Sequence, residues 1–289
     1  MNSFHIVADS CADLTPEYLS AVTDMTYIRM NYTLDGADNK APLEPAEIAK
    51  LYAELRSGKV ITTTQINMIE YFGIFEPFAK AGTPVLCLVF SSGLSGTFGA
   101  AVVARNMIME KYPSAEIYVV DSLSASRGEG LLLHYIIQKR AEGMTAKDAA
   151  KWAEDNRKHL IHWFTVDDLM FLKRGGRVSA TSAFLGTMIK IKPVLKVDDE
   201  GHLIPVEKVQ GRRRAMHSIA DRIKESGIDL ENQTLFLGHG DCLEEAELLK
   251  ERLLSVTGCK GVEIGYIGPI IGAHSGPGTL AVFCLGGNR

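Results

Sequence analysis

The stretch Ser91-Ser92-Gly93-Leu94-Ser95-Gly96-Thr97 decides the fold, because it separates two segments of different character. Residues 85–90 before it are apolar and short enough for a buried strand, and residues 98–112 after it are typical of a helix. A strand that turns at glycines into a helix brings hydroxyls and backbone N–H groups to a helix N-terminus, where an anion is stabilised. Because the stretch contains no Lys or Arg, it suits a singly charged carboxylate better than a polyphosphate.

The first half of the chain alternates short apolar runs with amphipathic segments. Further strands are expected at residues 5–8 and 117–120. Further helices are expected at about 128–142 and from Thr145, which is suited to cap its helix. This alternation predicts a parallel sheet with helices on both faces. We therefore expect residues 1–157 to form an α/β domain of three layers.

The second half has a different pattern. Residues 192–197 and 203–209 flank the turn-forming sequence Asp198-Asp199-Glu200-Gly201, which predicts a hairpin. Because a hairpin pairs its strands in antiparallel fashion, we expect residues 158–289 to form an α+β domain with a mixed sheet. The other elements expected in this half are strands at 162–166, 235–237, 262–267 and 280–285, and helices at 212–226 and 244–256.

Short polar side chains follow three of the expected parallel strands. They are the pairs Asp9-Ser10, Ser91-Ser92 and Asp121-Ser122. Ligands of open α/β sheets bind in the crevice beyond the carboxyl ends of the strands, so the three pairs together predict a binding site there. The alternative is that each pair only caps the helix that follows.

Three consecutive threonines, Thr62, Thr63 and Thr64, have two possible roles. They precede an apolar helix expected from about residue 68, and their hydroxyls are suited to cap it. The other possibility is that they face the same crevice as Ser95. The sequence alone leaves both open.

Two histidines stand among glycines. His274 lies in residues 268–278, which contain four glycines and two prolines. So rigid a loop usually positions a side chain, although a structural histidine is the alternative. His239 lies in Gly238-His239-Gly240-Asp241 at the end of an expected strand, and for this histidine we favour a structural role.

Cations gather in Leu172-Lys173-Arg174-Gly175-Gly176-Arg177 and in Arg212-Arg213-Arg214. Runs of this kind are usually solvated faces. Together, however, the two runs are able to hold a phosphate or an acidic partner near the mouth of a site.

Composition excludes several classes of protein. A net charge of -4 over 289 residues argues against a large nucleic-acid interface. No apolar run approaches about 18 residues and the first residues do not resemble a signal peptide, so we expect neither a membrane span nor secretion. The five cysteines include no C-x-x-C pair, and histidine pairs lack metal-ligand spacing, so we expect no metal, no disulfide and a cytoplasmic location.

Taken together and in order, these motifs resemble the DegV family over nearly the whole chain. The resemblance implies two domains that bind a long-chain fatty acid, with the carboxylate at the domain interface and the acyl chain buried. It further implies a non-catalytic, acyl-binding subunit of a bacterial fatty acid kinase, with no cofactor of its own. The segments that carry the resemblance are Asp9-Ser10-Cys11 with Asp13-Leu14, Thr63-Thr64-Gln65, 91–97, Asp121-Ser122, 172–178, Ile191-Lys192-Pro193 and 267–278.

By the same resemblance, Thr63 and Ser95 are expected to hydrogen-bond the carboxylate, and His274 to lie nearby. Arg174 is the expected contact of the head group or of the acyl phosphate product. The predicted carboxylate site is completed by Thr64 and Ser92.

The chain departs from the family pattern at two positions. Ile66 stands where a proline is usual, and Gln210 where a basic residue is common, with Arg212 as a possible substitute.

Two alternative functions remain open on the sequence alone. One is a hydrolase with Ser95 or Ser92 as nucleophile and His274 or His239 as base. The other is a regulator that binds nucleic acid through its arginine clusters, which the net negative charge disfavours.

Overall fold

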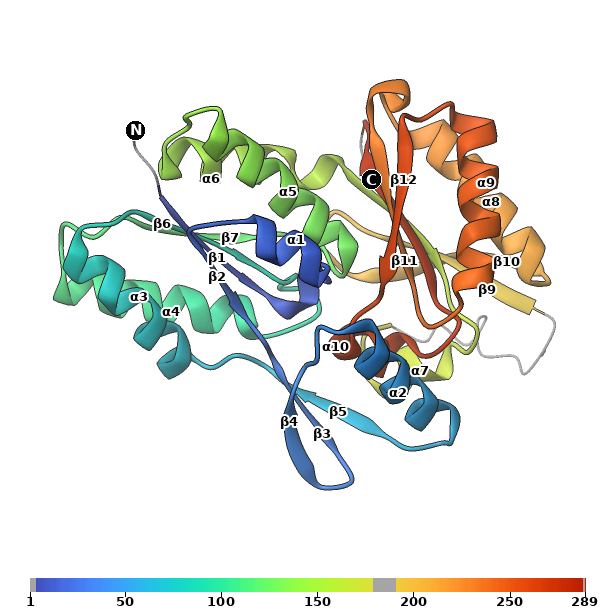
Figure 1. Ribbon diagram of the computed structural model, residues 1–289, viewed down its shortest axis with the longest axis horizontal. Helices are drawn as coiled ribbons and strands as arrows, with labels where there is room; N and C mark the ends of the chain where they lie inside the picture. Colours follow the sequence, from blue (N-terminus) through green and yellow to red (C-terminus); the bar gives the residue numbers. More distant parts are fainter. Residues whose placement is uncertain (1–3, 179–190, 288) are drawn as a thin grey trace.

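A computed structural model describes residues 4–178, 191–287 and 289 (Figure 1). Its first half contains a sheet of four strands that are all parallel. The strands, in spatial order, are β2 (Met25–Ile28), β1 (His5–Asp9), β6 (Val85–Val89) and β7 (Ile117–Asp121).

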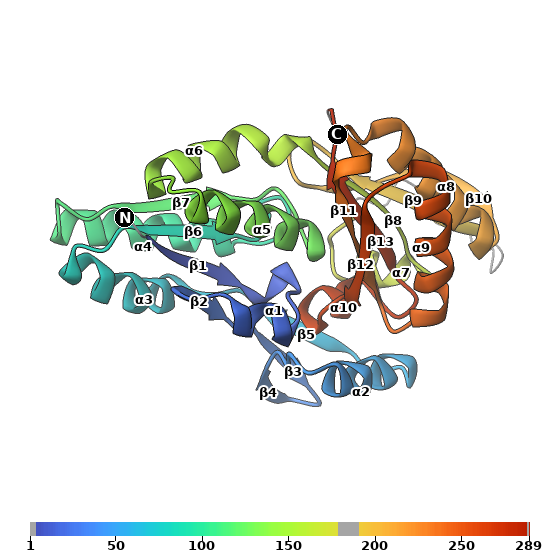
Figure 2. The ribbon, with the colours of Figure 1, turned by 45° about the horizontal axis from the view of Figure 1, so that its top comes forward.

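Helices cover both faces of this parallel sheet (Figure 2). Side chains alternate between the faces along a strand, so Val7 and Cys87 pack in one hydrophobic cluster while Ile6 and Leu86 pack in another. The predicted three-layer arrangement is confirmed. The covering helices are α3 (Met68–Ala81) and α4 (Thr97–Lys111) on one face and α5 (Arg127–Ala141) and α6 (Ala146–Asn156) on the other, while the short α1 (Pro16–Ala21) follows β1.

The second half contains a mixed sheet of six strands, as predicted. Only β11 and β12 are parallel neighbours; the other described neighbours are antiparallel. Helices α8 (Arg212–Ser226) and α9 (Leu243–Thr257) cover its outer face. The strand order is β10 (Leu203–Gln210), β9 (Ile191–Val197), β8 (Leu160–Thr165), β13 (Leu280–Leu285), β11 (Thr234–His239) and β12 (Gly261–Tyr266).

The inner face of the mixed sheet packs against the first half of the chain. Phe164 and Phe283 from this face share one hydrophobic cluster with Leu131 and Leu132 of α5. The two halves therefore share part of their core. A domain boundary between residues 157 and 158 stays a prediction.

A small antiparallel sheet in the first half was not predicted. It consists of β4 (Ala37–Lys40), β3 (Asn31–Leu34) and β5 (Ile61–Thr64), and β4 is fully exposed. Such short strands with polar sequences carry little of the alternation that marks a strand. The remaining elements are α2 (Pro45–Arg56), α7 (Met170–Arg174), α10 (Pro269–Ser275) and the 3-10 helices Ser10–Ala12, Arg157–His159 and Leu230–Asn232.

Two local predictions need correction. The glycine-rich segment around His274 is not simply a loop, because Pro269–Ser275 forms the short helix α10, with Pro269 at its first position. Helix α3 is capped by the Asn67 side chain, which accepts from the Glu70 N–H, and not by the preceding threonines. Across residues 4–178, 191–287 and 289, no helix is long and apolar enough to cross a membrane.

Candidate ligand cavity

A cavity of about 340 Å³ lies between the loops that follow the parallel strands and the inner face of the mixed sheet. Its volume falls in the usual range for small-molecule sites. Most of its lining is apolar, and the polar groups are concentrated near β5 and α10. The lining residues are Met30, Thr63, Thr64, Gln65, Phe90, Leu94, Ser95, Gly96, Ala125, Ser126, His162, Phe164, Leu172, Arg177, Val197, Leu203, Ile267, Ile270, Ile271, His274, Ser275, Thr279, Ala281 and Phe283.

Three of the predicted carboxylate ligands meet at the polar end of the cavity. The Thr63 hydroxyl lies 2.8 Å from Nε2 of His274, so β5 and α10 are joined there. The Ser95 hydroxyl accepts from the backbone N–H of Thr97 at 3.2 Å and lies 2.9 Å from the Thr97 hydroxyl. Ser95 therefore stands at the start of α4, where an anion is favoured.

His274 is uncharged at neutral pH. Burial lowers the pKa of its imidazole to about 4, and the nearby Arg177 adds to the effect. The ring packs closely on α7, since a Cβ at Gly175 would lie 2.4 Å from Nδ1. A neutral imidazole held in this way hydrogen-bonds with a fixed orientation but contributes no positive charge.

Among the described residues, the cation that lines the cavity is Arg177 and not Arg174. The Arg177 side chain donates from Nε to the Leu94 carbonyl at 3.2 Å and also donates to the Gly175 carbonyl. Arg174 is exposed and its guanidinium stacks 4.8 Å from the centre of the Phe171 ring. Gly176, with φ of 71°, lies between the two arginines and turns the chain. The Gly175-Gly176 pair is therefore the feature of the sequence which indicates that the side chains of Arg174 and Arg177 point in different directions.

The apolar part of the cavity runs along the mixed sheet. Thr279, Ala281 and Phe283 alternate onto its inner face, and their neighbours on β8, Phe164 and His162, line the same space. Four residues separate Thr279 from Phe283, a span of about 13 Å at about 3.3 Å per residue. The Thr279 hydroxyl donates to the Ser275 carbonyl at 3.1 Å, which fixes this end beside α10. The cavity is therefore elongated and leads away from His274.

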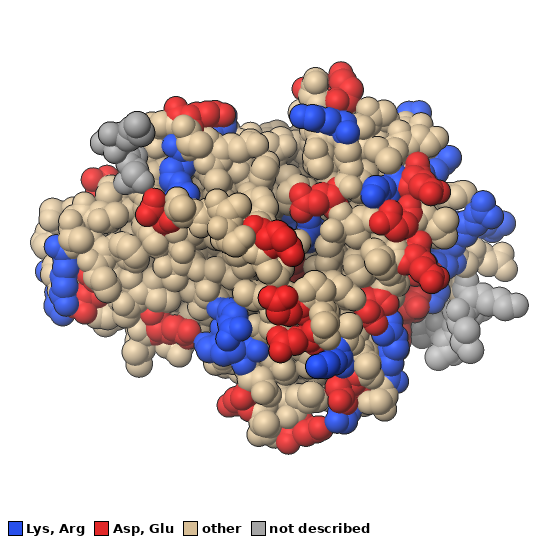
Figure 3. All heavy atoms as spheres, viewed as in Figure 1, with Lys and Arg blue, Asp and Glu red and all other residues tan. Residues whose placement is uncertain are grey.

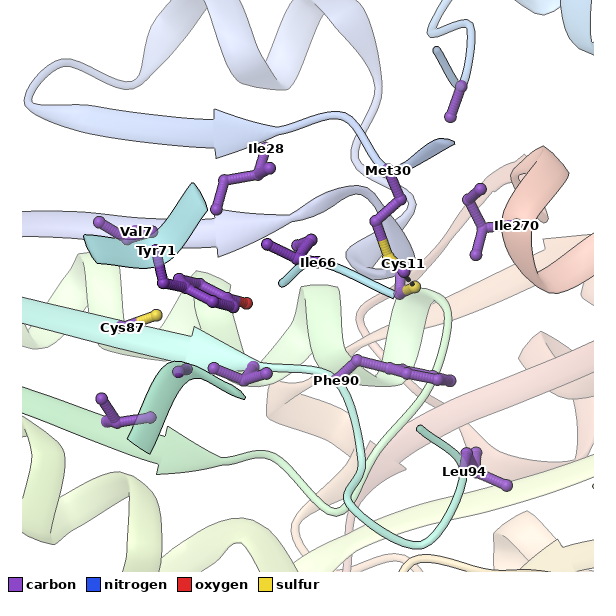
Figure 4. Packing of buried hydrophobic residues seen from close by; sticks show 14 of the residues in the cluster. Val7, Cys11, Ile28, Met30, Ile66, Tyr71, Cys87, Phe90, Leu94 and Ile270 are labelled. Atoms are coloured by element: carbon purple, nitrogen blue, oxygen red, sulfur yellow. Dashed lines mark hydrogen bonds between the residues drawn. The ribbon is translucent and has the colours of Figure 1, made fainter. Parts of the chain in front are cut away.

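The opposite wall comes mostly from the first half of the chain. Figure 4 shows Met30, Phe90, Leu94 and Ile270 around a common space, although they come from three separate segments, the last of them α10. Phe90 and Leu94 belong to the stretch between β6 and α4. This wall is hydrocarbon, as a lipid tail requires.

Ser91 and Ser92 have roles other than the predicted one. The Ser91 hydroxyl donates to the Gly201 carbonyl at 2.9 Å, which ties the Ser91 loop to the β9–β10 turn. Ser92 is exposed, its backbone N–H donates to Asp121, and it is not among the residues that line the cavity. We therefore leave Ser92 out of the site.

The acidic side chains at the strand ends shape turns. Asp9 is fully buried and accepts from the Cys11 and Phe90 N–H groups. Asp121 accepts from the N–H groups of Ser92 and Leu123. Neither carboxylate lines the cavity. The capping alternative is correct for Asp9, which caps the 3-10 helix Ser10–Ala12, whereas Asp121 holds a turn and caps no helix, because α5 begins after Ser126.

Arg212 does not replace the missing cation at position 210. Its guanidinium pairs with Glu245 at 2.9 Å and with Asp167 at 3.7 Å, and it also donates to the Gly278 carbonyl. Gln210 is exposed at the end of β10. The possible substitution of Arg212 for a basic residue is therefore not supported.

Residues 3–286 match a family model described as "Uncharacterised protein, DegV family". Among curated proteins, the chain is 38% identical to a DegV domain-containing protein of Clostridium perfringens, over 100% of this chain and 99% of the relative. It is 35% identical to a DegV domain-containing protein of Lactococcus lactis, over 98% of each chain.

Solved structures resemble the whole fold. A fatty-acid-binding DegV family protein from Thermus thermophilus is 27% identical, with a TM-score of 0.85 over 98% of this chain and 99% of that one. A fatty-acid-binding DegV protein from Bacillus subtilis is 26% identical, with a TM-score of 0.83 over 98% and 99%. A DegV lipid-binding protein from Thermotoga maritima is also 26% identical, with a TM-score of 0.86 over 99% of both chains.

Proposed function

This chain belongs to the DegV family, and we propose that it binds one long-chain fatty acid in the cavity between its two main sheets. One observation carries the proposal: a mostly apolar cavity has Thr63, Ser95, the neutral His274 and Arg177 among its lining residues, with Thr63 bonded to His274 and Arg177 bonded to the Leu94 carbonyl beside Ser95. The solved relatives that bind fatty acids support the same ligand class.

The carboxylate is proposed to lie among Thr63, Ser95, His274 and Arg177, with Thr64 at the exposed edge. The two hydroxyls donate hydrogen bonds to the carboxylate, and Arg177 supplies the positive charge that the neutral His274 does not. This assignment adds Arg177 to the predicted residues.

The acyl chain supplies most of the binding free energy. Burial of about 15 methylenes at about 0.8 kcal/mol each gives roughly 12 kcal/mol before the costs of association. One charge-assisted hydrogen bond contributes only about 1.5–3 kcal/mol. The tail therefore sets affinity, while the polar end sets the position of the carboxylate.

We further propose that the protein presents this carboxylate to a separate kinase subunit, which phosphorylates it with ATP. The protein itself is then a non-catalytic carrier in the cytoplasm. Exposed Arg174, at the end of α7 and three residues from Arg177, is the proposed contact with the kinase or the acyl phosphate.

The geometry supports a serine hydrolase less well. The described contacts pair Ser95 with Thr97 and His274 with Thr63, so they include no serine–histidine pair at this site. A nucleic-acid-binding role has equally little support, because Arg212 is engaged by two carboxylates.

The test is extraction of the purified protein with organic solvent and identification of released ligands by mass spectrometry. We expect a long-chain fatty acid at close to one per protein. An extract without fatty acid, together with no binding of added palmitate to the extracted protein, would contradict the proposal.

A further inference from the structure

A second cavity, of about 320 Å³, lies on the other side of the wall that encloses the first. Ser126 lines the first cavity, Asp13 lines the second, and the Ser126 hydroxyl donates to the Asp13 carboxylate at 2.5 Å. Its volume is also in the range of small-molecule sites. The lining residues are Ser10, Asp13, Leu14, Thr15, Pro16, Glu17, Tyr27, Ala41, Pro42, Leu43, Pro45, Ile48, His239, Leu243, Glu247, Ile264, Gly265, Tyr266, Gly268 and Pro269.

His239 offers this cavity a hydrogen-bond donor. Its side chain is only 3% exposed, and the Cys242 N–H donates to its Nδ1 at 3.3 Å. Burial lowers the pKa of the imidazole to about 4, so the ring is neutral and, with a lone pair on Nδ1, carries its proton on Nε2. In the described part of the chain no acceptor pairs with this N–H. An unpaired donor on the wall of a cavity favours a ligand that brings an acceptor.

The ionisable side chains that give the second cavity its charge are acidic. Among the described lining residues Glu17 and Glu247 are exposed carboxylates, burial raises the pKa of Asp13 to about 7, and none is Lys or Arg. Arg127 lies behind the wall at Gly265 and is engaged by Glu263 and the Asp13 carbonyl. Figure 3 shows acidic side chains near the centre of the face that carries α1, α2 and β12.

We propose that the second cavity binds a small organic amine. Its apolar body packs on Tyr27, Pro42 and Leu243, and a hydroxyl or carbonyl oxygen accepts from Nε2 of His239. The ammonium group lies toward Glu17 and Glu247, which are both exposed at the rim; Glu247 also pairs with Lys250 at 3.3 Å, so Glu17 is the carboxylate without that competition. Because Lys and Arg are absent from the described lining, an anion with the same body binds more weakly. The proposal does not depend on fatty-acid binding.

The test compares three probes with the same aromatic body. Tyramine has both a hydroxyl and an ammonium group, phenethylamine lacks the hydroxyl, and 4-hydroxyphenylacetate replaces the ammonium with a carboxylate. Binding is measured by NMR titration of the backbone signals of Gly240 and Tyr266, which lie beside His239. We expect tyramine to bind about threefold to tenfold more tightly than phenethylamine, as one hydrogen bond implies, and 4-hydroxyphenylacetate to bind most weakly.

Variants locate the site. Leu243 and Leu248 are both exposed on α9, but only Leu243 lines the cavity, so Leu243→Lys should weaken tyramine binding at least about tenfold while Leu248→Lys does not. His239→Phe should make tyramine and phenethylamine bind equally. Urea unfolding, measured on every variant, reports that the fold is intact.

Three results would overturn the proposal: equal affinity of the wild type for the three probes, full tyramine affinity of Leu243→Lys, or no saturable binding of tyramine below about 10 mM.

Discussion

The two cavities differ in charge although a neutral histidine forms a hydrogen bond in the wall of each, the half-buried His274 in the first and the buried His239 in the second. Burial lowers the pKa of both His274 and His239 to about 4. The first cavity places hydroxyls and Arg177 beside its histidine, whereas the second places carboxylates near its own. The histidines therefore do not set the charge of the ligand. Their neighbours do, and those neighbours come from distant parts of the chain.

The largest expected effect follows from closing the apolar part of the first cavity alone. Phe283→Trp adds bulk to the inner face of β13 beside His162, about 13 Å from Thr279, and should exclude about four methylenes of a long acyl chain. The loss of about 3 kcal/mol corresponds to roughly 100-fold weaker palmitate binding. Isothermal titration measures it. Decanoate, which is shorter, should bind within a few-fold of its wild-type affinity, and tyramine binding should not change. Equal losses for palmitate and decanoate would contradict the proposed direction of the tail.

The next effect concerns the polar end of the first cavity. Thr63→Ala and Ser95→Ala should each weaken fatty-acid binding by roughly 10–100-fold, or about 1.5–3 kcal/mol, because each removes a hydrogen bond to a charged group. Thr62→Ala is the matched control, since Thr62 is exposed on the same strand and does not line the cavity. Full affinity in both site variants would remove the carboxylate from this end.

A third experiment compares the two histidines by the effect of each on how the free energy of unfolding changes with pH. Each has a folded-state pKa of about 4, below the unfolded value of 6.5. Between these values the unfolded chain binds more protons, so stability is fully present above about pH 6.5 and falls as the pH falls. From pH 7 to pH 5, each histidine should lower the free energy of unfolding by about 2 kcal/mol.

Urea unfolding at the two pH values measures this effect. The wild-type dependence also includes Asp13, whose pKa is raised to about 7 by burial and which acts with the opposite sign. His274→Gln and His239→Gln should therefore each be compared with the wild type. In each variant the decrease in the free energy of unfolding from pH 7 to pH 5 should be smaller than in the wild type by about 2 kcal/mol. If the free energy of unfolding of a variant changes with pH as it does in the wild type, the replaced histidine has a pKa near 6.5 in the folded protein, which would contradict the prediction.

The smallest change in affinity is expected at Arg174. Arg174→Ala should leave palmitate affinity within a few-fold, because the side chain is exposed and does not line the cavity. With the cognate kinase and ATP, acyl phosphate formation should fall at least about tenfold, as loss of a charge-assisted contact implies. Arg177→Met is the comparison variant and should weaken palmitate binding itself. Unchanged turnover of Arg174→Ala would make Arg174 an ordinary surface charge.

Much of the fold could be predicted because its signals are local. The buried strand β6 is an unbroken apolar run, and Thr145 caps α6 as its position suggests. In contrast, β4 is four exposed residues whose strand structure depends on pairing with β3. Such pairing carries almost no local signal.

The site was predicted in part for the same reason. Thr63, Thr64, Ser95 and His274 were found as motifs and line one cavity. Arg177 was recognised only as part of a run of cations, and Arg174 was preferred to it, because the contact of Arg177 with the Leu94 carbonyl joins residues 83 positions apart. A motif shows which side chains are present, whereas their directions depend on long-range packing.

The place of β13 in the mixed sheet has a consequence for synthesis on the ribosome. This late strand lies between β8 and β11, and it contributes Ala281 and Phe283 to the first cavity. Until it emerges, β8 and β11 each lack a neighbour and the cavity lacks a wall. A nascent chain therefore completes the first cavity only after residue 285 has emerged, long after β8, and it exposes apolar strand edges until then.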